Sequence, residues 1–581
     1  MGFLKNFLAS CLGALMAFVL LIVVGGIVFS MIINSDNKVV ISDNSVLYLD
    51  LNSPIVELAI DDPLAELIPG EEPAIGLLQL KDAIAYAKTD AKTKGIYLRL
   101  NELQAGITSI KEIRESLLDF RESGKWVVAY SSGYSEGAYY LASAADHIYL
   151  NPEGQVELNG LSINVTFFKR LLDKLEIKPQ VFRVGDFKSA VEPFVRENMS
   201  EENRLQLNQM VNGLYDGMLK DISAARQIPE DDLAALAKTM VVRKPGDAIT
   251  YKLVDALMFE DQVRDELRNR LGLEASDKIG FVRFTEYTRS MNFKSSPNEI
   301  AVIVADGEIM PGKADNGLVG SSTFVNELRR ARNNDRVKAI VIRVNSPGGV
   351  FQAADDIWRE VALATEKKPV IASMSDYATS GGYYLAMASD TIVAQPTTVT
   401  GSIGIFSVLF DMSGLLENKL GITSEEVKTG DVGGLITVTR PLTAMEQEIW
   451  QQQTNDLYEA FTRKAAEGRG MSQENIKKIA SGRVWTGVHG KDNGLVDILG
   501  SYQDAIEIAA TKAGIAADYK VRYYPQPKTF LEKLTSGWED QVSSKAIAKE
   551  MGDSYYFYQG WKKLQRYQGV QARLPFELEI K

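Results

Sequence analysis

The longest uncharged apolar stretch of the chain lies near its N-terminus. From Asn6 to Ser35 no residue carries a charge, and most are apolar. About 20 apolar residues span a bilayer as a helix, so this segment is long enough to cross one with some tilt. Lys5 precedes it and Asp36 follows it. Because positive charge favours the cytoplasmic side, the pattern predicts one transmembrane helix within residues 1–37, with the rest of the chain outside.

A cleaved signal peptide is the alternative interpretation of this segment. Such a peptide has an apolar core of about 7–15 residues and ends in a small-residue cleavage site. Here the apolar run is longer and ends in Met31-Ile-Ile-Asn34, which favours an uncleaved anchor. Cys11 follows a lipoprotein-like Leu-Ala-Ser, but the apolar run comes after it rather than before it. We therefore interpret Cys11 as an ordinary small residue of the span.

Short apolar runs alternate with helical patterns in the rest of the chain. Ile300–Val304, Ala339–Val344 and Val370–Ser373 have the length and composition of buried strands, and Thr323–Asn333 has a helical pattern. This alternation predicts an α/β fold of βαβ units with mainly parallel strands. Ligand sites in such folds lie at the carboxyl ends of the strands.

The chain also repeats itself at an offset of 242–244 positions. The matching pairs are 95–101 with 339–345, 137–146 with 381–390, 148–152 with 392–396, and 253–255 with 495–497. Four matches at nearly one spacing predict two copies of one α/β domain, joined by a short polar linker near Ser295–Asn298. The predicted units are the anchor (1–37), the first copy (38–295), the second copy (296–527) and a C-terminal extension (528–581), which has no counterpart in the first copy.

Composition removes several classes of function. The net charge of −12 gives the 581-residue chain no general attraction to nucleic acid. One cysteine excludes an intrachain disulfide. His147 and His489 are the only histidines, which leaves little room for a Ser-His-Asp triad or a histidine-rich zinc site. His147 has the pattern of a structural residue, and His489 lies in a polar, solvent-facing stretch. We expect neither metal nor cofactor.

Candidate chemistry appears in the second copy, where two strands end. Ser380 follows a strand and opens a helix, next to the Ser346-Pro-Gly-Gly349 loop. The N–H of Gly381, with that of Gly348 or Gly349, could form an oxyanion hole. At the matching place the first copy has Glu136, and its loop is Glu102–Gly106. A Ser-Gly-Gly at a helix start is usually a cap or turn, but the paired loop and the loss in the other copy favour a nucleophile.

A base for this serine appears only in the first copy. Aligning Gly-Asp in Arg183–Ala190 with Gly-Asp in Lys428–Gly434 puts Gly433 opposite Lys188. A desolvated lysine can accept a proton from serine. Lys188 could also be a surface charge, paired with Glu192. Since each copy lacks what the other keeps, the simplest interpretation is one composite Ser380–Lys188 site.

These motifs resemble the long-form signal peptide peptidase A (protease IV) family. They are GDFKSAVEPF around Lys188, NSPGG, ATSGGYYLA around Ser380, TGSIGIF at 400–406 and VWTG…GLVD at 484–497. The resemblance covers nearly all of the chain after the anchor. It implies a tandem duplication of a Clp protease/crotonase-like domain, a serine nucleophile and a lysine base. It also implies that Ser402, matched by Leu158 in the first copy, lies near the lysine amine.

The resemblance implies further properties of the whole protein. It implies a bowl-shaped homo-oligomer, a tetramer, on the outer, periplasmic face of a bacterial cytoplasmic membrane. Signal peptides left after leader peptidase cleavage, and other hydrophobic peptides, would be its substrates. The sequence therefore predicts a membrane-bound serine endopeptidase that acts through an acyl-enzyme. A crotonase-like acyl-CoA hydratase or isomerase and a non-enzymatic membrane scaffold are the alternatives. The preferred cleavage sequence, the oxyanion glycine of the loop and the role of residues 528–581 stay open.

Overall fold

The structure is a computed structural model that describes residues 2–33, 41–59, 74–101, 103–291, 295–313, 317–525 and 569–574. Helix α1 (Gly2–Ile33) covers most of the segment expected to cross a membrane. Among the described residues, no helix has both the length and the apolar character that a membrane crossing requires. Of the predicted C-terminal extension, only Gly569–Leu574 lies within the described residues.

The first copy is built on a six-stranded sheet in which every pairing is parallel. Its order is β8 (Ala256–Leu257), β6 (His147–Leu150), β5 (Trp126–Ser131), β4 (Thr93–Arg99), β1 (Ser45–Asp50) and β9 (Gly280–Arg283). The helices around it include α2 (Leu77–Thr89), α3 (Ile107–Arg121), α4 (Glu136–Ala142), α7 (Glu201–Arg226), α8 (Glu230–Lys238), α10 (Glu260–Leu271) and α11 (Phe284–Ser290). Central strand residues such as Ile96 and Leu98 are fully buried, as expected for a parallel sheet covered on both faces.

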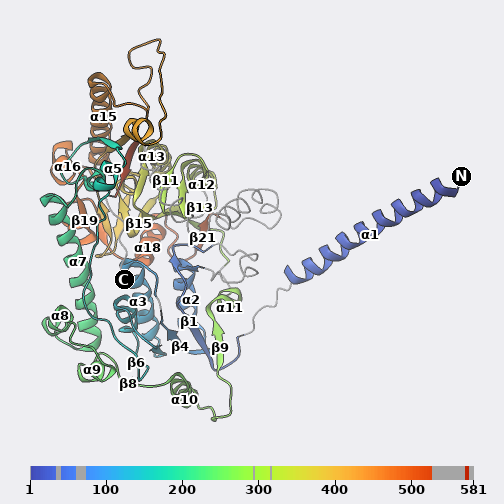
Figure 1. Ribbon diagram of the computed structural model, residues 1–581. Coiled ribbons are helices and arrows are strands. Elements are labelled where there is room, and N and C mark those ends of the chain that lie inside the picture. The colour runs from blue at the N-terminus through green and yellow to red at the C-terminus, as the bar shows by residue number, and fades with distance from the viewer. Residues whose placement is uncertain are drawn as a thin grey trace.

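The second copy repeats this plan. Its main path is β19 (Val484–Thr486), β17 (Val399–Gly401), β15 (Val370–Thr379), β13 (Val337–Ser346), β10 (Glu299–Asp306) and β21 (Lys520–Tyr524), with β16 (Thr391–Ala394) and β20 (Ile498–Leu499) branching from β15. Its helices include α12 (Ser321–Asn333), α13 (Phe351–Thr365), α14 (Gly381–Ala386), α15 (Ala444–Arg469), α16 (Gln473–Ile479), α17 (Gly487–Asp492) and α18 (Tyr502–Lys512). In Figure 1, β13, β15, α12 and α13 lie above the first-copy elements β1, β4, α2 and α3.

The two copies keep the offset seen in the sequence. Helices α2 and α12 differ by 244 positions at both ends, and so do α3 and α13, and β6 and β16. The duplication is therefore structural as well as sequential, and each copy has its own main hydrophobic core. The predicted limits of the four units stay a prediction.

A third sheet contains strands from both copies. Its order is β12 (Leu318–Gly320), β11 (Glu308–Met310), β14 (Gly348–Val350), β22 (Gly569–Arg573), β18 (Phe406–Asp411) and β7 (Lys178–Arg183). First-copy strand β7 pairs antiparallel with second-copy strand β18 along its full length, from Arg183 opposite Phe406 to Lys178 opposite Asp411. This pairing carries the chain that follows β7, which includes Lys188, into the second copy.

A buried ion cluster also joins the copies. The Arg343 guanidinium of β13 donates to Glu57 at 2.7 Å and to Glu112 of α3 at 2.8 Å, and all three side chains are fully buried. It also donates to the hydroxyls of Ser373 and Ser375 in β15. Burial alone would raise the pKa of Glu112, but Arg343 holds it below its usual value. The cluster is therefore ionised. Because it is shielded from water, each charge is stabilised by its oppositely charged partners instead.

We expect Arg343→Ala to lower the free energy of unfolding by about 3–5 kcal/mol, because it leaves the Glu57 carboxylate buried without its ion pair and Glu112 paired with Lys81 alone. Urea unfolding of the purified chain, followed by circular dichroism, measures the change. Arg336→Ala, at an exposed arginine directly before the first residue of β13, is the matched control. Equal unfolding midpoints for the two variants would contradict a structural role for the cluster.

Candidate active site

Ser380 lies at the junction between β15 and α14. Its backbone has φ 53° and ψ −112°, a conformation that non-glycine residues rarely adopt. Its N–H donates to the Gly401 carbonyl at 2.8 Å, which ties the junction to β17. Strained backbone of this kind is held by surrounding structure and occurs often at functional sites. The side chain is fully buried, at the carboxyl end of a central strand.

Lys188 follows β7 in the first copy but is held by the second. The Phe187 N–H donates to the Ser481 carbonyl at 3.1 Å. A Cβ atom on Gly482 would lie 2.6 Å from the Lys188 Cα, and one on Gly404 would lie 3.2 Å from its Cδ. Only glycine at position 482 lets the two backbones approach this closely. The Lys188 side chain is fully buried as a result.

The Lys188 amine meets three oxygen atoms. Its Nζ lies 2.8 Å from the Ser380 Oγ, 3.1 Å from the Ser402 Oγ and 3.1 Å from the Ser402 carbonyl oxygen. A neutral amine has two N–H donors and one lone pair, so it can donate to both Ser402 oxygens and accept from the Ser380 hydroxyl. The structure therefore brings together Ser380, Lys188 and Ser402.

Burial sets the charge state of this amine. Desolvation lowers the pKa of Lys188 well below its usual value. Within the described part of the chain, no carboxylate forms an ion pair with it to oppose that effect. Glu192, the pairing partner considered from the sequence, instead accepts from the Ser200 hydroxyl and from the Asn203 side-chain amide at 3.0 Å. The surface ion pair is therefore excluded.

The glycines of the loop differ in what their amides do. The Gly348 N–H donates to the Ser346 Oγ at 3.2 Å, and Gly348 has φ +100°. The Gly349 nitrogen would lie 3.2 Å from a Cβ placed on Gly381, so these two residues adjoin. Because the Gly348 amide is held by Ser346 of its own loop, whereas Gly349 adjoins Gly381, Gly349 is the better candidate to act with Gly381 as an oxyanion donor.

In the first copy, Glu136 occupies the position that matches Ser380. Glu136 begins α4, and its carboxylate accepts from the backbone N–H groups of Asn159 at 3.2 Å and Gly160 at 2.8 Å. Burial raises the pKa of Glu136. Leu158 is also fully buried. The first copy thus holds a carboxyl group against backbone amides where the second copy holds Ser380.

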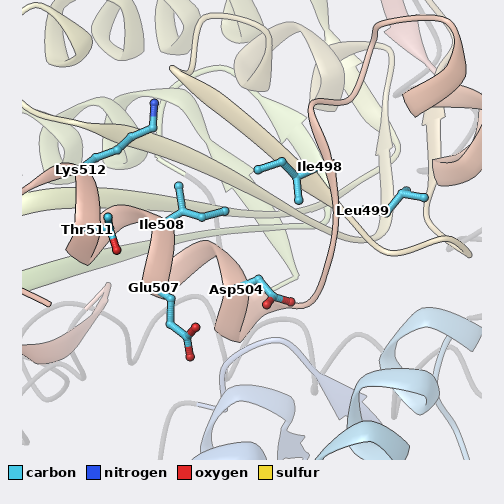
Figure 2. Close-up of a pocket in the computed structure, with 7 residues that line it drawn as sticks. All are labelled: Ile498, Leu499, Asp504, Glu507, Ile508, Thr511 and Lys512. Atoms are coloured by element: carbon cyan, nitrogen blue, oxygen red, sulfur yellow. The ribbon is translucent and has the colours of Figure 1, made fainter.

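The pocket found in the described part of the chain lies apart from Ser380, Lys188 and Ser402. A pocket of about 500 Å³ is formed by α18 and β20, where Ile498 and Ile508 point toward each other (Figure 2). Its lining contains none of the predicted site residues: it consists of Ile498, Leu499, Asp504, Glu507, Ile508, Thr511 and Lys512. In the described ranges no group of His, Cys, Asp and Glu side chains is arranged to hold a metal ion.

Sequence reasoning missed two contributors to the site. Gly482 and Ser481 support the Lys188 backbone, and the only signal for them was a Ser-Gly pair just before the VWTG motif. Strand β22 was also missed. It comes from the C-terminal extension, whose sequence has no counterpart in the first copy.

Comparison with known proteins finds the same family in each of the two copies. The sequence profile of peptidase family S49 matches residues 119–274 and 362–516. The chain is 38% identical over 476 residues to "Protease 4" of Salmonella typhi, which covers 80% of this chain and 76% of that protein. It is 34% identical over 476 residues to "Serine protease SPPA, chloroplastic" of Arabidopsis thaliana, covering 80% of this chain and 70% of that protein.

A solved structure is also similar over part of the chain. A ClpP1 variant from Listeria monocytogenes shares 18% sequence identity, with a TM-score of 0.24, over 35% of this chain and 94% of that one.

Proposed function

Since the chain belongs to peptidase family S49 and is a serine peptidase with two S49 domains, we propose that it is a membrane-bound endopeptidase with Ser380 as nucleophile and Lys188 as general base. Its proposed substrates are hydrophobic peptides, with signal peptides left after leader peptidase cleavage as the main class. The observation that carries the proposal is the fully buried Lys188 amine, 2.8 Å from the Ser380 Oγ with no carboxylate partner among the described residues.

The first chemical step follows from this geometry. Neutral Lys188 accepts the Ser380 proton as the hydroxyl attacks a peptide carbonyl carbon. Ser402 accepts two N–H bonds from the amine, which orients the remaining lone pair toward Ser380. The protonated lysine then gives its proton to the leaving amine, and an acyl-enzyme remains. Water, activated by the same lysine, attacks the ester carbonyl and releases Ser380.

Backbone amides supply the electrostatic part of catalysis. The N–H groups of Gly381 and Gly349 are the proposed donors to the oxyanion that forms in each tetrahedral intermediate. Losing one such donor typically costs about 10²–10³ in kcat, so these amides are of the same importance as the base. The amides belong to β14 and α14, whereas the base comes from the first copy, so the proposed mechanism needs both copies in place.

The remaining proposals concern the surroundings of the enzyme. We propose that residues 6–35 anchor it in a bacterial cytoplasmic membrane, with both copies on the outer, periplasmic side. The support is the uncharged sequence, with Lys5 before it. We also propose a homo-oligomer, a tetramer, and its support is the resemblance to the signal peptide peptidase A family.

We expect Ser380→Ala and Lys188→Met each to lower kcat/KM for a fluorogenic hydrophobic peptide by about 10³-fold or more, because each removes one half of the proton transfer. The double variant is expected to be no worse than the single ones, since the two residues act as a unit. Lys178→Met, at an exposed lysine of β7, is the matched control. A Lys188→Met chain that keeps a tenth of the parental kcat/KM, with the fold intact by circular dichroism, would refute the lysine base.

Deleting residues 2–35 is expected to move the chain from the membrane pellet to the soluble fraction after cell lysis, because the uncharged segment is its proposed anchor. Alkaline extraction of membranes followed by immunoblotting measures this. Added protease should degrade the intact chain in spheroplasts without lysis. Recovery of the full chain in the soluble fraction, or its protection in spheroplasts, would contradict the proposed location.

A further inference from the structure

Helix α7 carries two polar side chains on the face that it buries. Its buried side chains are apolar from Leu207 onward, but Asn203 and Gln206, 2% and 1% exposed, precede them. A buried amide group needs hydrogen-bond partners, because leaving it without them costs free energy. The partners of Gln206 lie in both copies, next to Lys188 and next to Ser402.

On one side the Gln206 amide holds the turn that carries Lys188. Its Nε2 donates to the Phe187 carbonyl oxygen at 3.1 Å and to the Ser189 Oγ at 3.0 Å. The Phe187 carbonyl belongs to the same planar peptide unit as the Lys188 N–H, so this bond fixes the backbone that leads into Lys188. The Ser189 hydroxyl in turn donates to the Asn203 Oδ1 at 2.8 Å. The residues on either side of Lys188 are thus both bonded to α7.

On the other side the same amide holds the strand that supports Ser402. The Val484 N–H of β19 donates to the Gln206 Oε1 at 3.2 Å. This N–H shares a planar peptide unit with the Arg483 carbonyl, which accepts from the Ser402 N–H at 2.7 Å. Successive hydrogen bonds through one peptide unit strengthen one another. A continuous hydrogen-bonded path therefore leads from Gln206 to the Ser402 backbone.

One side-chain amide thus joins the backbone of the base to the backbone of the serine that orients it. The same two residues meet again at their side chains, where the Lys188 Nζ lies 3.1 Å from both the Oγ and the carbonyl oxygen of Ser402. A long side chain such as lysine reaches one point reproducibly only when its own backbone is held. The Gln206 amide supplies that restraint from the side opposite to the dyad.

The copy without the lysine lacks this amide. Helix α15 is the counterpart of α7, because both have 26 residues and their ends are 243 positions apart. At that offset Ile449 matches Gln206, and Glu446 matches Asn203. An apolar side chain is therefore sufficient where no base has to be placed, and packing of the helix alone does not require the amide.

We propose that Gln206 is a positioning residue of the dyad, which holds Lys188 and Ser402 at one separation. At that separation the lysine amine donates to Ser402 and keeps its lone pair for the Ser380 hydroxyl. The inference rests on the proposed function. Gln206 acts through two peptide units and contacts neither the substrate nor the reacting atoms.

Gln206→Met tests this directly, because it keeps the length of the side chain and removes its hydrogen bonds. A misplaced catalytic group can cost about 10²-fold, so we expect kcat for a fluorogenic hydrophobic peptide to fall about ten- to a hundredfold and KM to change less than about twofold. Counting only molecules that react with a fluorophosphonate excludes unfolded chain. Asn208→Met, at an exposed residue of α7, is the matched control. Parental kcat in Gln206→Met would overturn the inference.

Gln206→Glu gives a second readout. Once ionised, the new side chain still accepts from β19 but no longer donates to the Lys188 turn, and it adds negative charge there. The charged groups packed around this turn include Glu192, which accepts from Asn203 at 3.0 Å, and Arg483, whose guanidinium lies 4.9 Å from the centre of the Phe187 ring.

Negative charge favours the protonated amine. We therefore expect the rate constant for fluorophosphonate reaction to level off at a higher pH than in the parent, by about one unit or more, and at a lower value. If Gln206 had only a structural role, the substitution would lower the urea midpoint and leave this profile in place, which would overturn the inference.

The parent and the control separate the two proposals. If the parent neither hydrolyses the peptide nor reacts with the fluorophosphonate, the proposed function fails. If the parent and Asn208→Met are active and both Gln206 variants match them in kcat and in pH profile, only the positioning role fails.

Discussion

The burial of one amine is the constraint on which the site depends. Lys188 is fully buried and meets only the oxygens of Ser380 and Ser402, so the free energy of desolvation favours its neutral form. A solvated lysine at the same distance would be protonated at neutral pH and could not accept a proton. The geometry of the dyad is therefore useful only because the surrounding protein excludes water from it.

Residues from both copies together bury the Lys188 amine. The first copy supplies Lys188, and the second supplies Ser380, Ser402 and the glycine that lets the Lys188 backbone approach. The β7–β18 pairing and the ion cluster of Arg343 hold the two copies in register. With Glu136 in its own matching place, the first copy contributes Lys188 alone to the proposed site.

The sequence predicted those parts of the arrangement that depend on local motifs or on the repeat between the two copies. The duplication was visible because four segments of the sequence, such as 95–101 and 339–345, recur at an offset of 242–244 positions. Comparing the copies then isolated Ser380 and Lys188. The contacts of Arg343 with Glu57 and Glu112, and the pairing of β22 with β14, join residues more than 200 positions apart. No local pattern records such partners. The choice between Gly348 and Gly349 likewise needed the hydrogen bond of one amide to Ser346.

The most direct test of the account is the pH dependence of Ser380 modification. The second-order rate constant for fluorophosphonate reaction depends on the neutral fraction of Lys188, so it rises with pH through the lysine pKa and is constant above it. Because burial lowers that pKa, we expect the plateau to be reached well below about pH 10.4, the value for an exposed lysine. Ser380→Ala should not react, and Lys188→Met should react slowly without this rise. A rate constant for the parent that keeps rising to about pH 10 would contradict a neutral, desolvated lysine base.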